Sequence, residues 1–121
     1  MNKEQVAFSA GYAEIYTVEN VAEKGDKPVN KLVNRRKVRF DYRTIGAVRF
    51  FMAKQANVEI DKTIIIPKGP HVSPQDIVIL RSEKNEENEQ YEIVQTQVKT
   101  DTAPRTILLT LKRRTEKYDF A

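Results

Sequence analysis

The chain has 121 residues, a formal net charge of +4 and no cysteine. This length suffices for one compact domain with a modest core, and a 40% share of apolar residues is typical of a folded domain. The lack of cysteine excludes disulfides, thiolate metal sites and thiol nucleophiles. The N-terminus lacks a signal-peptide core and no apolar run is long enough to span a bilayer. We therefore expect an intracellular soluble protein without membrane contact, or one packed into a particle assembled inside a cell.

The charges are segregated along the chain. Residues 24–43 contain the basic side chains Lys24, Lys27, Lys31, Arg35, Arg36, Lys37, Arg39 and Arg43, against Asp26 and Asp41. Residues 83–92 reverse the sign, with Glu83, Glu86, Glu87, Glu89 and Glu92 against Lys84. Such segregation suits a protein that contacts a polyanion on one side and another protein elsewhere, although solvated charged loops produce the same pattern.

A first strand is predicted for residues 8–18, with a bend or bulge at Gly11. Ala13 and Ile15 alternate with a second face that includes Tyr16, so both faces of this strand are partly apolar. This pattern fits a strand of a small barrel that has one face in the core and the other face against a neighbour.

Residues 19–36 show no periodicity, contain Gly25 and Pro28, and are rich in lysine and arginine. We predict a long basic loop over this range. A loop of this length is unusual in a compact domain and is more often functional than idle.

Residues 37–43 alternate cleanly, with Phe40 on the apolar face and charged side chains on the other, which predicts a half-buried strand. Residues 47–56 place apolar side chains at helical spacing and predict a short helix. An extended conformation stays open as the alternative because Phe50 and Phe51 are adjacent.

Further strands are predicted for residues 58–66, 77–80, 91–98 and 106–112. The run of isoleucines at 64–66 indicates a strand that is covered on both faces. Residues 113–121 are predicted to form a flexible solvated tail, with docking through Tyr118 and Phe120 as the alternative.

The expected fold class is therefore mainly β, in one domain over residues 1–121. Short strands separated by turns, without helices between them, favour a small β-barrel over an α/β fold. We expect about six strands, one short helix and the long basic loop.

The sequence offers no support for catalysis or for a cofactor. His71, the one histidine, lies close to Ser73 and Asp76, but all three belong to a single proline-rich loop. A catalytic triad needs members that converge from separate elements around a pocket. No phosphate-binding glycine-rich loop and no closely spaced metal-ligand set is present in the sequence, so we predict a protein that is not an enzyme, without metal or cofactor.

A small nucleic-acid-binding β-barrel is an open alternative. Single-strand binders combine a basic groove with exposed aromatic rings for base stacking. Phe40 and Tyr42, however, lie on the face assigned to the core, opposite the arginines. The basic segment therefore suits sequence-independent contact with phosphates rather than readout of bases.

A set of short motifs after residue 41 carries a resemblance through its order and spacing. The motifs are Tyr42-Arg43-Thr44-Ile45-Gly46, Arg49-Phe50-Phe51-Met52-Ala53, Ile66-Pro67, Val72-Ser73-Pro74, Asp76-Ile77-Val78-Ile79, Tyr91-Glu92-Ile93 and Leu108-Leu109-Thr110-Leu111-Lys112. This C-terminal two thirds of the chain resembles the head–tail adaptor proteins of long-tailed phages, which are also called head-closure or stopper proteins.

The resemblance implies a small β-barrel that is added as a ring beneath the portal or adaptor ring, closes the DNA channel and docks tail proteins. The implied location is the neck of a virion that is assembled in the bacterial cytoplasm. The resemblance also allows the isolated chain to be a monomer that forms a ring only on assembly. A loop of each subunit would reach the channel, and the 19–36 loop is the candidate for it. Its basic residues would then contact packaged double-stranded DNA without sequence specificity; they are Lys24, Lys27, Lys31, Arg35 and Arg36.

Ring formation also suggests contacts between subunits. Leu108 lies opposite Leu109 on a strand that is apolar on both faces, so it is a candidate for the neighbour's surface or for a core covered on both sides. Glu86 and Glu87 are candidates for an acidic contact with a basic surface of the next subunit. A tail-completion or tail-terminator ring protein is the alternative within phage biology.

Overall fold

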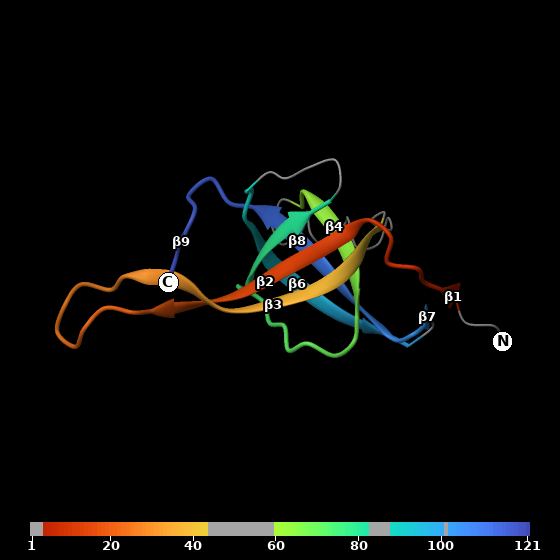
Figure 1. Cartoon of the computed structure of the whole chain (residues 1–121), viewed down its shortest axis with the longest axis horizontal. Helices are drawn as coiled ribbons and strands as arrows, with labels where there is room; N and C mark the ends of the chain where they lie inside the picture. The colour runs from red at the N-terminus through yellow and green to blue at the C-terminus, as the bar shows by residue number, and fades with distance from the viewer. Residues whose placement is uncertain (1–3, 44–59, 83–87, 101) are drawn as a thin grey trace.

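The computed structural model of the chain describes residues 4–43, 60–82, 88–100 and 102–121 (Figure 1). Its strands are β1 (Glu4–Gln5), β2 (Gly11–Asn20), β3 (Asn30–Arg43), β4 (Lys62–Pro67), β5 (Ile77–Arg81), β6 (Tyr91–Lys99), β7 (Thr102–Ala103), β8 (Thr106–Arg113) and β9 (Asp119–Phe120). The fold is mainly β, as predicted, and these described ranges contain no helix. The helix predicted for 47–56 lies outside them.

Six strands form one sheet that rings around on itself. The order of neighbours is β2-β5-β6-β8-β4-β3, and β2 also pairs with β3, so the ring of pairings closes. Each of these pairs is antiparallel. Two short additions lie outside the ring: β9 pairs parallel with β3, and β1 pairs parallel with β7.

The inner cluster is the set of apolar side chains that face the inside of the ringing sheet. Its buried members are Ala13, Ile15, Phe40, Ile64, Ile66, Val78, Leu80, Tyr91, Ile93, Ile107, Leu109 and Leu111. Every ring strand contributes to it, because alternate side chains of a strand point to the same face. On β4 the middle isoleucine, Ile65, is also fully buried, which confirms the prediction of a strand covered on both faces.

A second, smaller apolar cluster lies outside the ring. We call it the outer cluster; it consists of Tyr16, Leu32, Ile77 and Ile79, with Val18 and Tyr118 packed against it. It covers the second face of β2. The sequence predicted that this face packs against a neighbour. Part of this cover comes instead from the C-terminal segment of the same chain.

The boundaries of the predicted loop and tail differ from the structure. Residues 19–20 belong to β2 and residues 30–36 belong to β3, so the predicted 19–36 loop is limited to residues 21–29. The C-terminal segment forms β9 on the edge of β3, which agrees with the docking alternative rather than with a solvated tail. The bulge of β2 lies between Ile15 and Thr17, while Gly11 is where the strand begins.

Candidate functional site

The β2–β3 hairpin is the feature that most sets this molecule apart from a simple closed sheet. β5 pairs with β2 only over Tyr12–Tyr16, and β4 pairs with β3 only over Asp41–Arg43. The hairpin continues past these partners and projects from the body of the molecule, as the orange strands of Figure 1 show. A candidate functional site therefore consists of this projection and the contacts that hold it.

The end of the hairpin is organised by one asparagine. The Asn20 Oδ1 accepts hydrogen bonds from the backbone N–H groups of Ala22 and Val29, each at 3.0 Å. The Val21 N–H donates to the Val29 carbonyl at 2.9 Å, which closes the last cross-strand pair. The turn, residues 21–29, thus has a defined conformation although its side chains are largely exposed.

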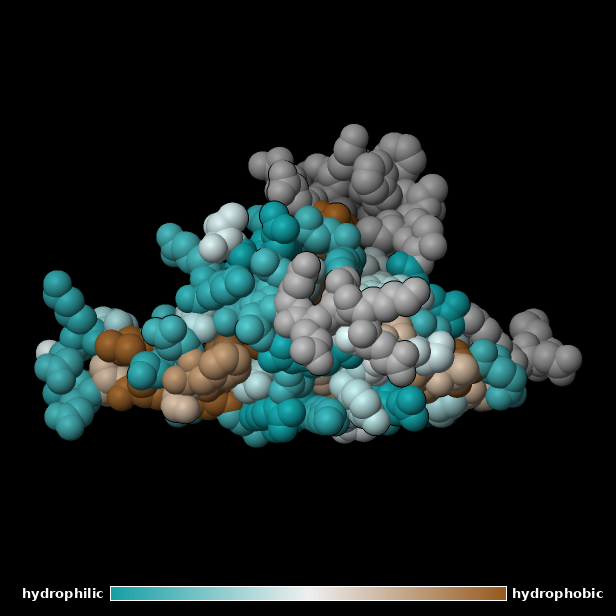
Figure 2. Space-filling model, turned by 45° about the horizontal axis from the view of Figure 1, so that its top comes forward, coloured by the Kyte–Doolittle hydropathy of each residue, from teal (hydrophilic) through white to brown (hydrophobic). Residues whose placement is uncertain are grey.

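The exposed apolar side chains of the chain include several on this projection. Val21 and Val29 are 44% and 45% exposed, and Phe120 of the C-terminal segment is 51% exposed. Figure 2 shows brown, apolar surface at the projecting end, between teal regions.

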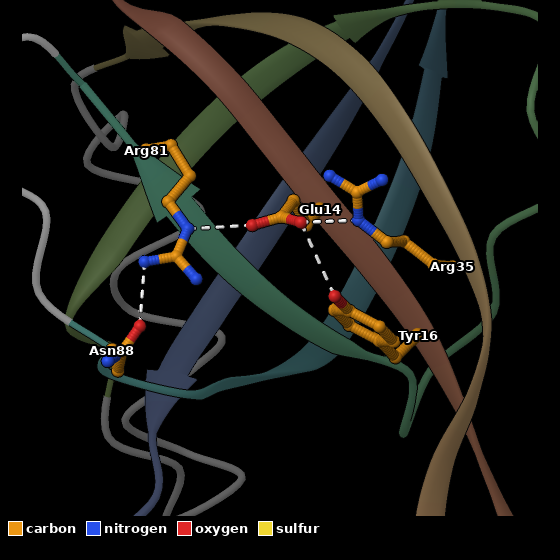
Figure 3. Close-up of polar contacts among 5 residues, drawn as sticks. All are labelled: Glu14, Tyr16, Arg35, Arg81 and Asn88. Carbon is orange, nitrogen blue, oxygen red and sulfur yellow. Dashed lines mark hydrogen bonds and ion pairs between the residues drawn. The ribbon is translucent and has the colours of Figure 1, made fainter. Parts of the chain in front are cut away.

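The base of the hairpin is held by an ionic network around Glu14. The Arg35 Nε donates to Glu14 Oε2 at 2.5 Å, and the Arg81 Nε donates to Glu14 Oε1 at 2.6 Å (Figure 3). Arg81 also donates from Nη1 to the Asn88 Oδ1 at 2.7 Å, and the Tyr16 hydroxyl donates to Glu14 at 3.3 Å. One carboxylate therefore joins β2, β3 and β5 at the point where the hairpin leaves the body.

The arginines decide the ionisation of this carboxyl. Burial alone would raise the pKa of Glu14, but the hydrogen bonds and charges of Arg81 and Arg35 outweigh burial and hold the pKa below its ordinary value of 4.5. Burial and then the Glu14 charge raise the pKa of the Tyr16 hydroxyl. Glu14 is therefore ionised, and Tyr16 is a neutral donor to it, at neutral pH.

A second ion pair joins the hairpin to the loop before β5. The Arg36 Nη2 lies 3.2 Å from the Asp76 Oδ2, and the Arg36 Nη1 donates to the Thr17 hydroxyl at 3.0 Å. The same Asp76 oxygen accepts the Ser73 backbone N–H at 3.0 Å. Asp76 is thus used to position the hairpin, and His71 contacts Ser73 rather than Asp76, at 3.3 Å.

The C-terminal segment ties the hairpin to the body from the other side. The buried Gln90 side chain donates from Nε2 to the Tyr118 carbonyl at 2.8 Å and accepts the Tyr118 N–H at 2.9 Å. Beyond this clamp, the Phe120 ring meets the Tyr16 ring edge-on at 5.3 Å, and the Ala121 N–H donates to the Leu32 carbonyl at 3.0 Å. We call residues 118–121 the C-terminal strap.

The structure separates the five predicted DNA-contacting residues. Lys24 and Lys27 lie in the exposed turn, where Glu23 and Asp26 balance their charges. Lys31 lies on β3 directly opposite Glu19. Arg35 and Arg36 are strand residues, engaged by Glu14 and Asp76. The five side chains therefore do not form one unpaired basic surface, and their role in DNA contact stays a prediction.

The predicted inter-subunit residues also stay predictions. Leu108 is half-buried on the outer face of β8, between Ile65 of β4 and Gln97 of β6. Glu86 and Glu87 lie outside the described residues. The half-buried state of Leu108 is compatible with either of the two positions expected for it.

Sequence reasoning missed the aromatic and basic face beside the ionic network. Tyr12 lies directly opposite Arg39, and the Lys37 Nζ lies 4.3 Å from the centroid of the Tyr12 ring. The strand alternation placed Arg39 on the outer face, but only the register of the hairpin shows that Tyr12 lies beside it on the same face. Tyr12 and Arg39 of this face line an open groove at the start of β2.

The parts of the chain that the structure describes contain no group of three side chains that would hold a metal ion. Within the same ranges, no helix is present that is long and apolar enough to cross a membrane. Comparison of the sequence with protein-family models and with curated proteins gives no match.

Proposed function

We propose that this chain is a structural protein of the head–tail junction of a tailed phage. In this proposal it is a small β-barrel that assembles as a ring under the portal or adaptor ring, closes the DNA channel and docks the tail. The observation that carries the proposal is the projecting β2–β3 hairpin, which ion pairs of Glu14 with Arg81 and of Arg36 with Asp76 and the C-terminal strap anchor to the ringing sheet.

The contacts that anchor the hairpin support a role for it in assembly. Two ion pairs and a clamped strap fix the direction in which the hairpin leaves the body. A fixed direction matters when identical copies surround an axis, since each hairpin then reaches the same place relative to that axis. Neighbouring copies would surround the channel in the same orientation, and the weak contacts that each copy makes with packaged double-stranded DNA would add up.

The partners in this proposal are other copies of the chain, the portal or adaptor ring above and tail-completion or tail proteins below. The exposed apolar side chains of the turn and of the C-terminal strap, Val21, Val29 and Phe120, are candidates for a protein contact. The charge balance of the turn also suits a protein surface at least as well as a polyanion. The proposed location is the neck of the virion.

Two other functions predict different behaviour. A tail-completion or tail-terminator protein would bind purified tail tubes rather than purified portal. A nucleic-acid-binding barrel would bind DNA tightly as an isolated monomer, with a strong dependence on salt. A head-closure protein needs its ring to gather many weak contacts.

The proposal is tested with DNA-filled heads that were assembled without this protein. Purified chain is added, and protection of the packaged DNA from nuclease is measured. We expect protection to rise with the amount of chain added. A variant whose turn, residues 21–29, is replaced by an Asn-Gly turn should keep its folded body but give less protection. Heads that neither bind the intact chain nor gain protection would contradict the proposal.

A further inference from the structure

An open groove of about 600 Å³ lies where β2 begins, next to the end of β5. The described residues that line it are Ser9, Ala10, Gly11, Tyr12, Arg39, Arg81, Ser82 and Asn88. Gly11 allows β2 to approach β5 here, because a side chain at this position would collide with the Arg81 carbonyl. The lining set contains two guanidinium groups and three hydroxyl side chains, and none of its members is a carboxylate.

Among the residues that the structure describes, basic side chains outnumber acidic ones around the groove. The Glu14 carboxylate at the hairpin base is engaged by both Arg35 and Arg81. Arg39 and Lys37 have no ion pair with any described residue. Among the described residues at the hairpin base, the four basic side chains Arg35, Lys37, Arg39 and Arg81 outnumber the carboxylates of Glu14 and Asp41, which gives this described face an excess of positive charge.

Tyr12 gives this positive face a defined geometry. Its ring is 41% exposed, and the Lys37 Nζ and the Arg39 guanidinium carbon lie 4.3 Å and 5.5 Å from its centroid. Contact with the ring restrains both long side chains while leaving their charged groups at the surface. Restraint of this kind lowers the entropy lost when an anion binds.

We propose that this groove binds a phosphate group, with Arg39 as its principal ligand. Guanidinium and hydroxyl donors are the groups that bind phosphate oxygens in proteins, and no described lining residue would repel them. The source of the phosphate is the backbone of double-stranded DNA, and this part of the inference rests on the proposed function. This inference places a DNA contact at the base of the hairpin, apart from the one predicted for the basic loop.

The turn of the hairpin provides the matched comparison. Lys24 and Lys27 are exposed, but Glu23 and Asp26 lie beside them in the turn. The variant pair Lys24→Gln and Lys27→Gln removes as much positive charge as the pair Lys37→Gln and Arg39→Gln. Any difference in DNA binding between the two double variants therefore reports on position rather than on net charge.

The experiment is an NMR titration of the isotope-labelled full chain with a short mixed-sequence DNA duplex at several salt concentrations. Inorganic phosphate is titrated separately. We expect the duplex to shift the amide signals of Ser9, Gly11, Tyr12 and Asn88. The Lys37 and Arg39 double variant should raise the Kd by about tenfold and reduce the salt slope by about two, whereas the turn variant should change the Kd by less than about twofold.

Each outcome decides the inference. Shifts at the turn instead of the groove, equal losses in both double variants, or no shifts with the intact chain would overturn the site. If inorganic phosphate saturates the shifts of the same amides at concentrations as low as those needed with the duplex, the groove is a phosphate site, but DNA is overturned as the source of the phosphate. The titration does not involve heads or tails, so failure of this site is distinguishable from failure of the head–tail assignment, which the head-protection assay measures.

Discussion

The body and the projecting hairpin share β2 and β3, but different forces hold them. In the body, the strands bury the inner cluster around Phe40, Ile64 and Leu109, and apolar burial dominates. In the hairpin, the outer cluster is small, and ion pairs, the Asn20 side chain and the Gln90 clamp replace much of that burial. The body thus depends on packing, whereas the direction of the hairpin depends on polar contacts that pH and single substitutions can alter.

The largest effect should follow from removing the ring of Phe40, which is fully buried in the inner cluster. We expect Phe40→Ala to lower the free energy of unfolding by about 3–5 kcal/mol, because it creates a cavity in the core. Tyr42→Ala on the same strand is the control; its ring is 42% exposed and its removal should cost about 1 kcal/mol. Chemical denaturation measures both values, and similar losses would show that Phe40 does not anchor the core.

Removing the carboxylate of Glu14 should have the second-largest effect. Glu14→Ala leaves Arg35 and Arg81 without their shared partner, and we expect a loss of about 2 kcal/mol at neutral pH. Because both arginines are partly exposed, water compensates some of the lost contact. Glu19→Ala, on the exposed part of the same strand, should change stability by less than about 0.5 kcal/mol.

The same network predicts a pH dependence. The folded-state pKa of Glu14 lies below its ordinary value of 4.5, so its stabilisation is complete above that pH and is lost as pH falls through the folded-state pKa. We expect Glu14→Gln to flatten the acid side of the stability profile, whereas Glu19→Gln should leave it unchanged. If the free energy of unfolding falls at acid pH by the same amount in the intact chain and in the Glu14→Gln variant, the assigned ion pairs are contradicted.

A smaller, local effect should follow from releasing the C-terminal strap. Gln90→Ala removes both side-chain hydrogen bonds to the Tyr118 backbone, and we expect a loss of about 1–2 kcal/mol. Hydrogen exchange should speed up at the Tyr118 and Ala121 amides more than at the amides of β8. Gln95→Ala, which changes an exposed glutamine of β6, should leave these amides protected.

The smallest effect should be confined to the turn of the hairpin. Asn20→Ala removes the acceptor for the Ala22 and Val29 amides, and we expect a loss of about 0.5–1 kcal/mol with faster exchange at these two amides. Asn30→Ala, at the paired position across the hairpin, is the control and should leave both amides unchanged. Equal exchange in both variants would mean that Asn20 does not organise the turn.

Periodicity was sufficient to predict the strands of the body. Residues 37–43, 77–80, 91–98 and 106–112 all fall within observed strands, because each presents alternate side chains to one apolar core. The isoleucines 64–66 correctly indicated burial on both faces. In these segments, local pattern and tertiary packing agree.

The hairpin was not predictable in the same way. Residues 30–36 are mostly polar, and they form a strand because β2 pairs with them, not because their own pattern requires it. The register also brings Glu14 to Arg35 and to Arg81, two partners that are far from it in sequence. Counted along the chain, residues 24–43 look strongly basic, but Glu14, Glu19 and Asp76 face several of these charges once the strands are paired.

Electron microscopy of lysates from a phage in which this gene is disrupted tests the central claim most directly. The account predicts separate tails beside heads that have lost their DNA, and joined particles when the intact gene is supplied in trans. Normally joined, DNA-filled particles in the absence of the gene would contradict a role at the head–tail junction.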